Sequence, residues 1–247
     1  MDLFDTNTTF ERQLFSKAAR NRIPLYGVLE LLPLCNLNCD MCYVHLSKQE
    51  MQSQGRLRSL DEWISLAKQM KDAGTLFLLL TGGEPLLFPQ FKELYCALKD
   101  MGMILTLNTN GTLINEEWAE FFAKNKPRRI NITLYGSKNE TYEKLCHMKD
   151  GFDKTIRGIE LLKKYKIDVK INGSLVKKNF HDRMEIIDIG EKYDIPVRID
   201  TYMYPSVRER TTPFNFHERL NPEDAAKARV EILHREMGDE LFEQYAK

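Results

Sequence analysis

Three cysteines within eight positions form the most chemically informative stretch of this sequence. Cys35, Cys39 and Cys42 lie in the segment Cys-Asn-Leu-Asn-Cys-Asp-Met-Cys, which directly follows an apolar run at residues 26–32. We interpret the run as a β-strand and the cysteines as part of the loop after it. Three thiolates can bind three irons of a [4Fe–4S] cubane and leave the fourth iron open to a ligand that is not protein. The pattern predicts a cluster at which a small molecule binds and reacts.

Two other uses of these thiols fit the pattern less well. A structural zinc ion takes four ligands, and His45 lies too close to Cys42 to be an obvious fourth one. A disulfide would leave one thiol of the three unpaired and would require an oxidising compartment. Both uses stay open as alternatives, and the cluster is the favoured interpretation because a second motif accompanies the cysteines.

The second motif is Gly82-Gly83-Glu84-Pro85, which follows an apolar run at residues 76–80. A run that is apolar at every position is typical of a parallel strand buried on both faces. Two adjacent glycines let the backbone approach a ligand closely and adopt positive φ. Glu84 could accept a hydrogen bond from an ammonium group. By itself the motif also fits a simple tight turn.

Strand-like and helix-like patterns alternate along most of the chain. Six segments have the composition of strands, and each is separated from the next by a segment that contains a helical pattern. Ser59 and Glu62 form a capping box that begins one of these helices, whereas residues 47–55 read as a polar loop. The strands are expected at residues 26–32, 76–80, 103–107, 129–134, 168–173 and 197–201. This rhythm predicts an α/β fold, a partial (β/α)6 TIM-like barrel of parallel strands with right-handed crossovers.

The ends of the chain lie outside this rhythm. We expect a helical lead-in at residues 1–25, with a short helix at 7–22, then the partial barrel at 26–205. A C-terminal extension at 206–247 contains a linker helix at about 222–237, because Asn221-Pro222-Glu223 is typical of an N-cap followed by proline at the first helical position.

The polar motifs follow successive strands. The cysteines follow the first strand and Gly-Gly-Glu-Pro the second, and Asn108-Thr109-Asn110-Gly111 lies at the end of the third. Thr133 and Asn172 lie at the ends of the fourth and fifth. Because ligands of parallel α/β barrels bind at the carboxyl ends of the strands, we expect these residues to share one active-site edge.

Composition excludes some classes of partner. Lys and Arg number 36, as do Asp and Glu, so the net charge is zero and the basic surface of a nucleic-acid-binding protein is not expected. The amino terminus lacks the basic and apolar regions of a signal peptide, and no apolar run is long enough to span a membrane. Clustered cysteines favour a reducing compartment. We expect a cytoplasmic protein without nucleic-acid or membrane partners.

The cysteine motif and Gly-Gly-Glu-Pro together resemble those of the radical S-adenosylmethionine (SAM) superfamily, over residues 26–205. The resemblance implies that Cys35, Cys39 and Cys42 hold a [4Fe–4S] cluster whose open iron is chelated by the amino and carboxylate groups of SAM. It also implies a reductant, such as flavodoxin or ferredoxin. An electron from the reduced cluster then cleaves SAM to methionine and a 5′-deoxyadenosyl radical, which abstracts a substrate hydrogen.

Position by position, the resemblance also implies a set of SAM contacts. Two positions depart from the family pattern: Met41 stands where an aromatic residue often precedes the third cysteine, and Leu145 stands where some branches have an arginine for the SAM carboxylate. Lys144 or Lys170 could replace that arginine, or the contact could be absent. The implied SAM contacts are Gly82, Gly83, Glu84, Thr109, Thr133 and Met203.

Residues 132–136 and 218–223 are similar to segments of the SPASM branch, whose members modify ribosomally made peptides or activate other enzymes. The resemblance therefore implies a peptide or protein substrate. Such enzymes usually carry auxiliary clusters in a cysteine-rich C-terminal region, whereas no cysteine follows Cys146 here. Either the chain lacks that region or it is a fragment, and we favour the fragment.

Other functions stay open at this point. Lys170-Ile171-Asn172 is similar to a substrate position of the enzymes that rearrange GTP for the molybdenum cofactor, so a small-molecule substrate is one alternative. A non-catalytic iron–sulfur electron carrier is another. Cys96 fits a small core residue, and Cys146-His147 is a weaker candidate for a second ligand pair.

Overall fold

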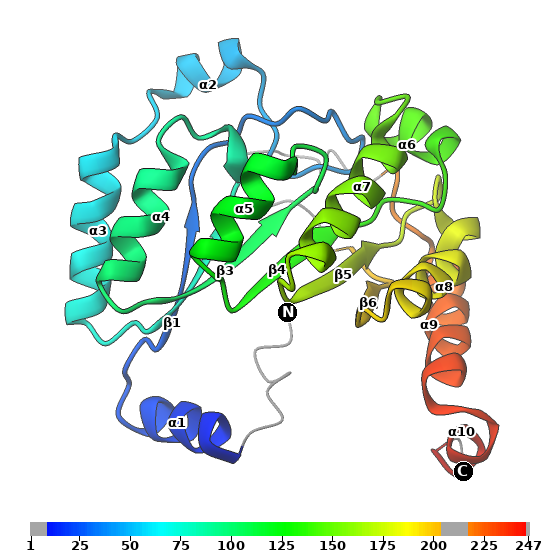
Figure 1. Cartoon of the computed structure of the whole chain (residues 1–247). Helices are drawn as coiled ribbons and strands as arrows, with labels where there is room; N and C mark the ends of the chain where they lie inside the picture. The colour runs from blue at the N-terminus through cyan, green and yellow to red at the C-terminus, as the bar shows by residue number, and fades with distance from the viewer. Residues whose placement is uncertain (1–8, 204–216, 246–247) are drawn as a thin grey trace.

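A computed structural model describes residues 9–203 and 217–245, and within them six strands form one parallel sheet (Figure 1). The strand order is β1-β2-β3-β4-β5-β6, so each strand pairs with its neighbour in the sequence. The strands are β1 (Tyr26–Glu30), β2 (Phe77–Thr81), β3 (Ile104–Thr109), β4 (Arg129–Thr133), β5 (Val169–Ser174) and β6 (Val197–Asp200). This order is that of a (β/α) barrel without its last two units, and the predicted partial barrel is confirmed.

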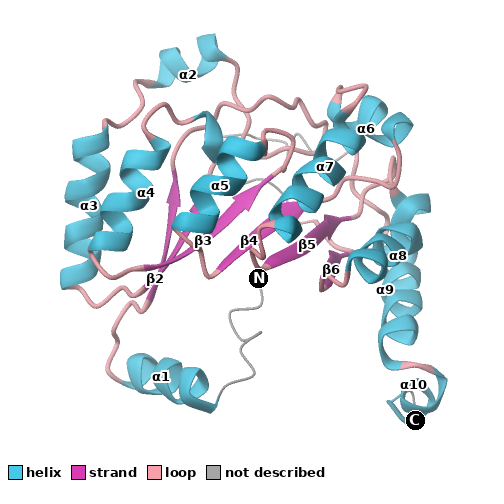
Figure 2. Ribbon diagram, in the orientation of Figure 1, coloured by secondary structure: helices cyan, strands magenta, loops and turns pink. Residues whose placement is uncertain are grey.

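Helices connect the strands and cover one face of the sheet (Figure 2). The α-helices between strands are α2 (Lys48–Gln54), α3 (Leu60–Asp72), α4 (Phe91–Asp100), α5 (Glu116–Lys124), α6 (Asn139–Cys146), α7 (Gly151–Lys164) and α8 (Arg183–Tyr193). Two short 3₁₀ helices, η1 (Pro85–Leu87) and η2 (Phe180–Asp182), follow β2 and β5. The terminal helices are α1 (Thr9–Arg20), α9 (Pro222–Met237) and α10 (Asp239–Tyr245).

The core lies between the sheet and its helices. Leu80, Leu107, Ile130 and Val169 stand in one register row across four strands, and all are buried. Because successive side chains of a strand point to opposite faces, the neighbouring positions in β3, β4 and β5 form the other face. That face carries half-buried polar side chains, including Thr106, Asn108, Asn131, Lys170 and Asn172.

Helix α1 covers the amino ends of the strands, away from the predicted site (Figure 1). Phe15 stacks on Phe77, the first residue of β2, with ring centroids 5.3 Å apart. Ala18 and Leu25 are buried in the same small cluster. Glu11 binds Arg128 at 2.9 Å, just before β4. The lead-in helix is thus packed against the barrel.

Residues 48–54 form helix α2, so the prediction of a polar loop over residues 47–55 is wrong. Ser47 Oγ accepts from the Glu50 N–H at 3.2 Å, and the Glu50 carboxylate accepts from the Ser47 N–H at 2.8 Å. This is the capping box that Ser59 and Glu62 also form at the start of α3, as predicted. Helix α2 buries no residue, so it has no apolar periodicity that would have revealed it.

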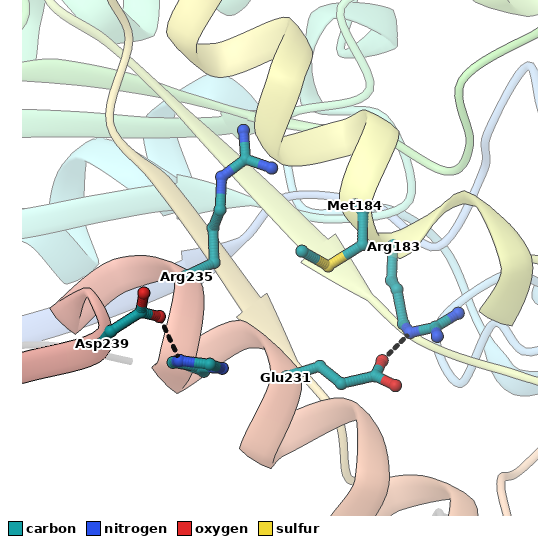
Figure 3. A pocket seen from close by; sticks show the side chains of 6 residues that line it. Arg183, Met184, Glu231, Arg235 and Asp239 are labelled. Atoms are coloured by element: carbon teal, nitrogen blue, oxygen red, sulfur yellow. Dashed lines mark hydrogen bonds and ion pairs between the residues drawn. The ribbon is translucent and has the colours of Figure 1, made fainter. Parts of the chain in front are cut away.

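Helix α9 packs against α8 on the outside of the barrel (Figure 3). Ala228 and Ile232 are buried there. Arg183 binds Glu231 at 2.6 Å, and Arg235 binds Asp188 at 2.7 Å. The apolar side of α9 is therefore buried against the barrel itself. Among the helices of the described ranges, none has the length and apolar character needed to cross a membrane.

Candidate active site

Backbone hydrogen bonds join two segments at the carboxyl ends of β1 and β2. One is the loop after β1 that contains the three cysteines (the cysteine loop), and the other is the Gly-Gly-Glu turn at residues 82–84. The Gly83 N–H donates to the Leu32 carbonyl at 2.7 Å, and the Glu84 N–H donates to the Leu34 carbonyl at 2.9 Å. A Cβ on Gly83 would lie 2.3 Å from the Leu34 oxygen, and one on Gly82, where φ is +158°, would lie 2.7 Å from the Leu32 oxygen. The sequence suggested that these glycines allow close approach to a ligand. In the structure they allow close approach to residues 32–34, which lead into the cysteines.

All three cysteines of the loop are half-buried, and none of them is in a disulfide. The Leu37 N–H donates to Cys35 Sγ at 3.4 Å, and the His45 N–H donates to Cys42 Sγ at 3.2 Å. Hydrogen bonds to sulfur are among the factors that set the potential of iron–sulfur clusters. These donors fit thiolates that would carry negative charge.

Cys39 lies beside Cys146, at the end of α6. A hydrogen bond with Cys146, together with burial, raises the pKa of Cys39 well above its usual value. Burial likewise raises the pKa of Cys35 to about 12. Both thiols therefore hold their protons in the metal-free protein, and binding of iron must displace those protons.

A site for a single metal ion would require several ligands that point to one position. Within the described residues, no group of three or more His, Cys, Asp and Glu side chains could hold one metal ion. A cubane needs no such convergence, because each thiolate binds its own iron.

An amide network links the cysteine loop to the loop after β3. Asn110 Nδ2 donates to Asn36 Oδ1 at 2.9 Å and lies 3.7 Å from Cys35 Sγ. Asn36 Nδ2 donates to Thr112 Oγ1 at 2.8 Å, and the Thr112 N–H donates to Asn110 Oδ1 at 2.9 Å. The sequence interpretation gave no role to Asn36 or to the Asn110 side chain. Their position in polar runs directly after two strands was the signal that could have identified them.

Glu84 is completely buried and binds the end of β3. Its carboxylate accepts from the Thr109 hydroxyl at 2.8 Å, the Asn110 N–H at 2.9 Å and the Leu86 N–H at 3.1 Å. Burial raises the pKa of Glu84 to about 7, and the three hydrogen bonds oppose that rise. Strand β3 extends to Thr109, two residues beyond the predicted end. Glu84 and Thr109 are therefore brought into direct contact.

The remaining predicted SAM contacts lie further along the same edge. Thr133 ends β4 and stands in register with Asn172. Met203 follows β6 and is half-buried against the core. Of the two lysines considered for the SAM carboxylate, Lys144 is exposed on α6, and Lys170 is half-buried on the polar face of β5.

The end of α6 holds the middle of the cysteine loop. The Leu145 carbonyl accepts from the Asp40 N–H at 3.0 Å, and the Cys146 carbonyl accepts from the Asn38 N–H at 3.2 Å. Leu145 and Cys146 are fully buried. His147 Nε2 lies 2.8 Å from Asp40 Oδ1, so the Cys146-His147 pair contacts the loop on both sides of Cys39.

Asp40 has a second partner, Lys178, on the loop after β5. Lys178 Nζ lies 2.5 Å from Asp40 Oδ2. Burial favours the neutral acid, but the hydrogen bonds from His147 and Lys178 outweigh it and lower the pKa of Asp40. A carboxylate thus stands between the second and third cysteines with both oxygens bound.

Two curated proteins are similar in sequence to this chain. The chain is 30% identical over 162 residues to the Fe-coproporphyrin III synthase of Methanosarcina barkeri, covering 66% of this chain and 40% of that protein. It is 28% identical over 195 residues to the antilisterial bacteriocin subtilosin biosynthesis protein AlbA of Bacillus subtilis, covering 73% of this chain and 43% of that protein. The chain thus spans less than half the length of these two curated relatives.

Two solved structures share the fold. Streptococcus suis SuiB bound to its precursor peptide SuiA superposes with a TM-score of 0.68 at 18% identity, covering 95% of this chain and 53% of that one. The anSMEcpe protein with bound AdoMet and the Cp18Cys peptide gives a TM-score of 0.69 at 22% identity, covering 86% of this chain and 59% of that one.

The radical SAM superfamily model matches residues 29–190. This range includes the three cysteines, the Gly-Gly-Glu turn, the end of β1 and the whole of strands β2 to β5. The cofactors of that family are a [4Fe–4S] cluster and SAM, which are those that the motifs predicted. Since the match spans more than half of the chain, the protein belongs to the radical SAM superfamily.

Proposed function

We propose that this chain is the catalytic barrel of a radical SAM enzyme that acts on a peptide or protein side chain. The observation that carries the proposal is the placement of Cys35, Cys39 and Cys42 on the loop after β1, at the carboxyl end of the sheet, with backbone N–H donors on two of the sulfurs. Cys35, Cys39 and Cys42 would hold the cluster. When bound, the cluster and SAM together supply an electron and a radical that removes hydrogen from a substrate.

The chain's own residues would bind and orient SAM beside these cysteines. We assign contacts with SAM to the backbone of Gly82 and Gly83, to Thr109 and Thr133, and to Met203. Glu84 has a different part in this proposal, because its buried carboxylate already accepts three hydrogen bonds. Glu84 would fix the position of Thr109 at the site and would not itself contact SAM.

The peptide substrate is supported by relatives and by the polar sheet face. AlbA is named for bacteriocin biosynthesis, another relative is a cysteine-type anaerobic sulfatase-maturating enzyme of Clostridium perfringens, and SuiB was solved with a precursor peptide. On the face away from the helices, Asn131 Nδ2 donates to Asn108 Oδ1 at 2.8 Å. Such amide groups suit hydrogen bonding to a peptide backbone. A flavodoxin or ferredoxin would supply the electrons.

The test is reconstitution of the chain with iron and sulfide without oxygen. We expect about four irons per chain and SAM cleavage that depends on dithionite. Cys39→Ala should lose both, whereas Cys96→Ala, the same change on the half-buried Cys96 of α4, should keep both. Zinc in place of iron, or cleavage retained by Cys39→Ala, would contradict the proposal.

A tetrapyrrole substrate is the second candidate, because relatives in Methanosarcina barkeri are named Fe-coproporphyrin III synthase and AdoMet-dependent heme synthase. Titration of the reconstituted chain with iron coproporphyrin III separates the two. Saturable changes in the porphyrin absorbance favour the tetrapyrrole. Their absence, together with transfer of deuterium from a labelled peptide to 5′-deoxyadenosine, favours the peptide.

A further inference from the structure

Asp40, Lys178 and Glu218 form a chain of charges across three distant parts of the sequence. Lys178 Nζ is shared between Asp40 Oδ2 at 2.5 Å and Glu218 Oε1 at 3.0 Å. The exposed fractions of the side chains are 27% for Asp40, 38% for Lys178 and 14% for Glu218. One ammonium group therefore joins the cysteine loop to the segment that precedes α9.

Backbone contacts hold the same junction together. The Lys177 N–H donates to the Glu218 carbonyl at 2.9 Å, and Lys177 Nζ donates to the His217 carbonyl at 2.8 Å. From Glu218 the chain runs through residues 219–221 into α9, which buries Ala228 and Ile232 in the core and is joined to α8 by two ion pairs, Arg183–Glu231 and Arg235–Asp188. The barrel thus fixes the position of Glu218. The ion pairs of Lys178 with Glu218 and Asp40 couple that position to the cysteine loop.

Lys178 carries the one positive charge among these three residues, so their arrangement depends on it. The two carboxylates lie on either side of its ammonium group, and Asp40 lies next to Cys39 in the sequence. Three thiolates at the loop would add negative charge. Without the Lys178 ammonium, Asp40 and Glu218 would repel each other and the thiolates, and like charges at short range destabilise an ordered arrangement.

We propose that Lys178 is a positioning residue that fixes the cysteine loop through Asp40 and makes the segment at Glu218 a structural part of the cluster site. The inference rests on the proposed function, because it takes the three cysteines to be the cluster ligands. It also gives residues 217–221 a role other than that of a linker.

The experiment compares variants of the full chain after reconstitution without oxygen. Lys178→Met keeps the apolar stem and removes the charge, and Lys178→Arg keeps the charge. Lys177→Met is the matched control, since Lys177 contacts a carbonyl of the same segment rather than Asp40. Iron and sulfide per chain, the rate of iron release to a chelator and the midpoint potential are measured for each.

We expect Lys178→Met to release iron about fivefold faster than wild type, the ratio that ~1 kcal/mol of a partly exposed ion pair represents. Its midpoint potential should be more negative, because a nearby positive charge that stabilises the reduced cluster has been removed. Lys178→Arg and Lys177→Met should stay near wild type in both measurements. A potential shift reversed by arginine would not follow from loss of packing alone.

Each outcome decides a separate question. If the wild-type chain binds no iron, the proposed function fails and this inference fails with it. If the wild-type cluster forms normally and Lys178→Met matches Lys177→Met, the inference alone is overturned. Should Lys178→Met fail to fold, Glu218→Gln supplies the second test. It weakens the contact that holds the Lys178 ammonium between the two carboxylates, so iron should be released faster than from wild type, and an unchanged rate would overturn the coupling.

Discussion

Glu84 should give the protein a pH-dependent stability that can be measured without any cofactor. Its carboxyl group is fully buried between the Gly-Gly-Glu turn and the end of β3. Burial raises its pKa from 4.5 to about 7, against three hydrogen bonds that favour the charged form. The folded state therefore holds the Glu84 proton more tightly than the unfolded state does.

The sign and size of the effect follow from linkage. A raised carboxyl pKa contributes stability that is fully present below about pH 4.5 and is lost as the pH rises through 7. At about 1.4 kcal/mol per pKa unit, the contribution lost between pH 5 and pH 8 is about 2–3 kcal/mol. Glu84→Gln has no proton to lose at this position, so it lacks this part of the pH dependence.

Urea unfolding of the cluster-free chain, with a reductant present, measures the free energy of unfolding at each pH. The difference between wild type and Glu84→Gln should change by about 2–3 kcal/mol from pH 5 to pH 8, with the variant gaining relative to wild type as the pH rises. Glu93→Gln, the same change on an exposed side chain of α4, should run parallel to wild type. Parallel curves for wild type and Glu84→Gln would refute the reasoning.

Three further predictions concern the contacts that hold the site. Gly83→Ala places a Cβ 2.3 Å from the Leu34 oxygen; it should lower the free energy of unfolding by about 2–3 kcal/mol and weaken iron binding, and a variant with wild-type stability and iron content would contradict the role given to this glycine. Asn110→Ala removes the amide that bridges Asn36 and Cys35; we expect about 1–2 kcal/mol less stability and faster iron release to a chelator, and equal release rates would argue against the network. Ile232→Ala should cost about 2–4 kcal/mol and expose α9 to limited proteolysis, whereas wild-type resistance would show that the helix is held otherwise.

Much of the architecture is encoded in local sequence patterns. The run at residues 76–80, the box at Ser59 and Glu62 and the alternation at residues 129–133 each report the immediate surroundings of a segment, and strands were found at the expected places. The cysteine spacing and the Gly-Gly-Glu-Pro motif were sufficient to predict the family. Helix α2 was not predicted because it buries no residue, so its sequence contains capping residues but no apolar periodicity.

The sequence by itself thus determined which residue types stand at the ends of which strands. Apolar strand patterns and the polar motifs after them can be read along the chain without knowledge of any tertiary contact. Only the tertiary structure decided which of these residues contact one another. Glu84 meets Thr109 only because β2 and β3 are neighbours in the sheet, and Lys178 meets Asp40 across 138 positions because the ends of β1 and β5 open onto the same edge. Such contacts depend on how loops fold over that edge, and loop positions carry no periodic signal from which a partner could be inferred.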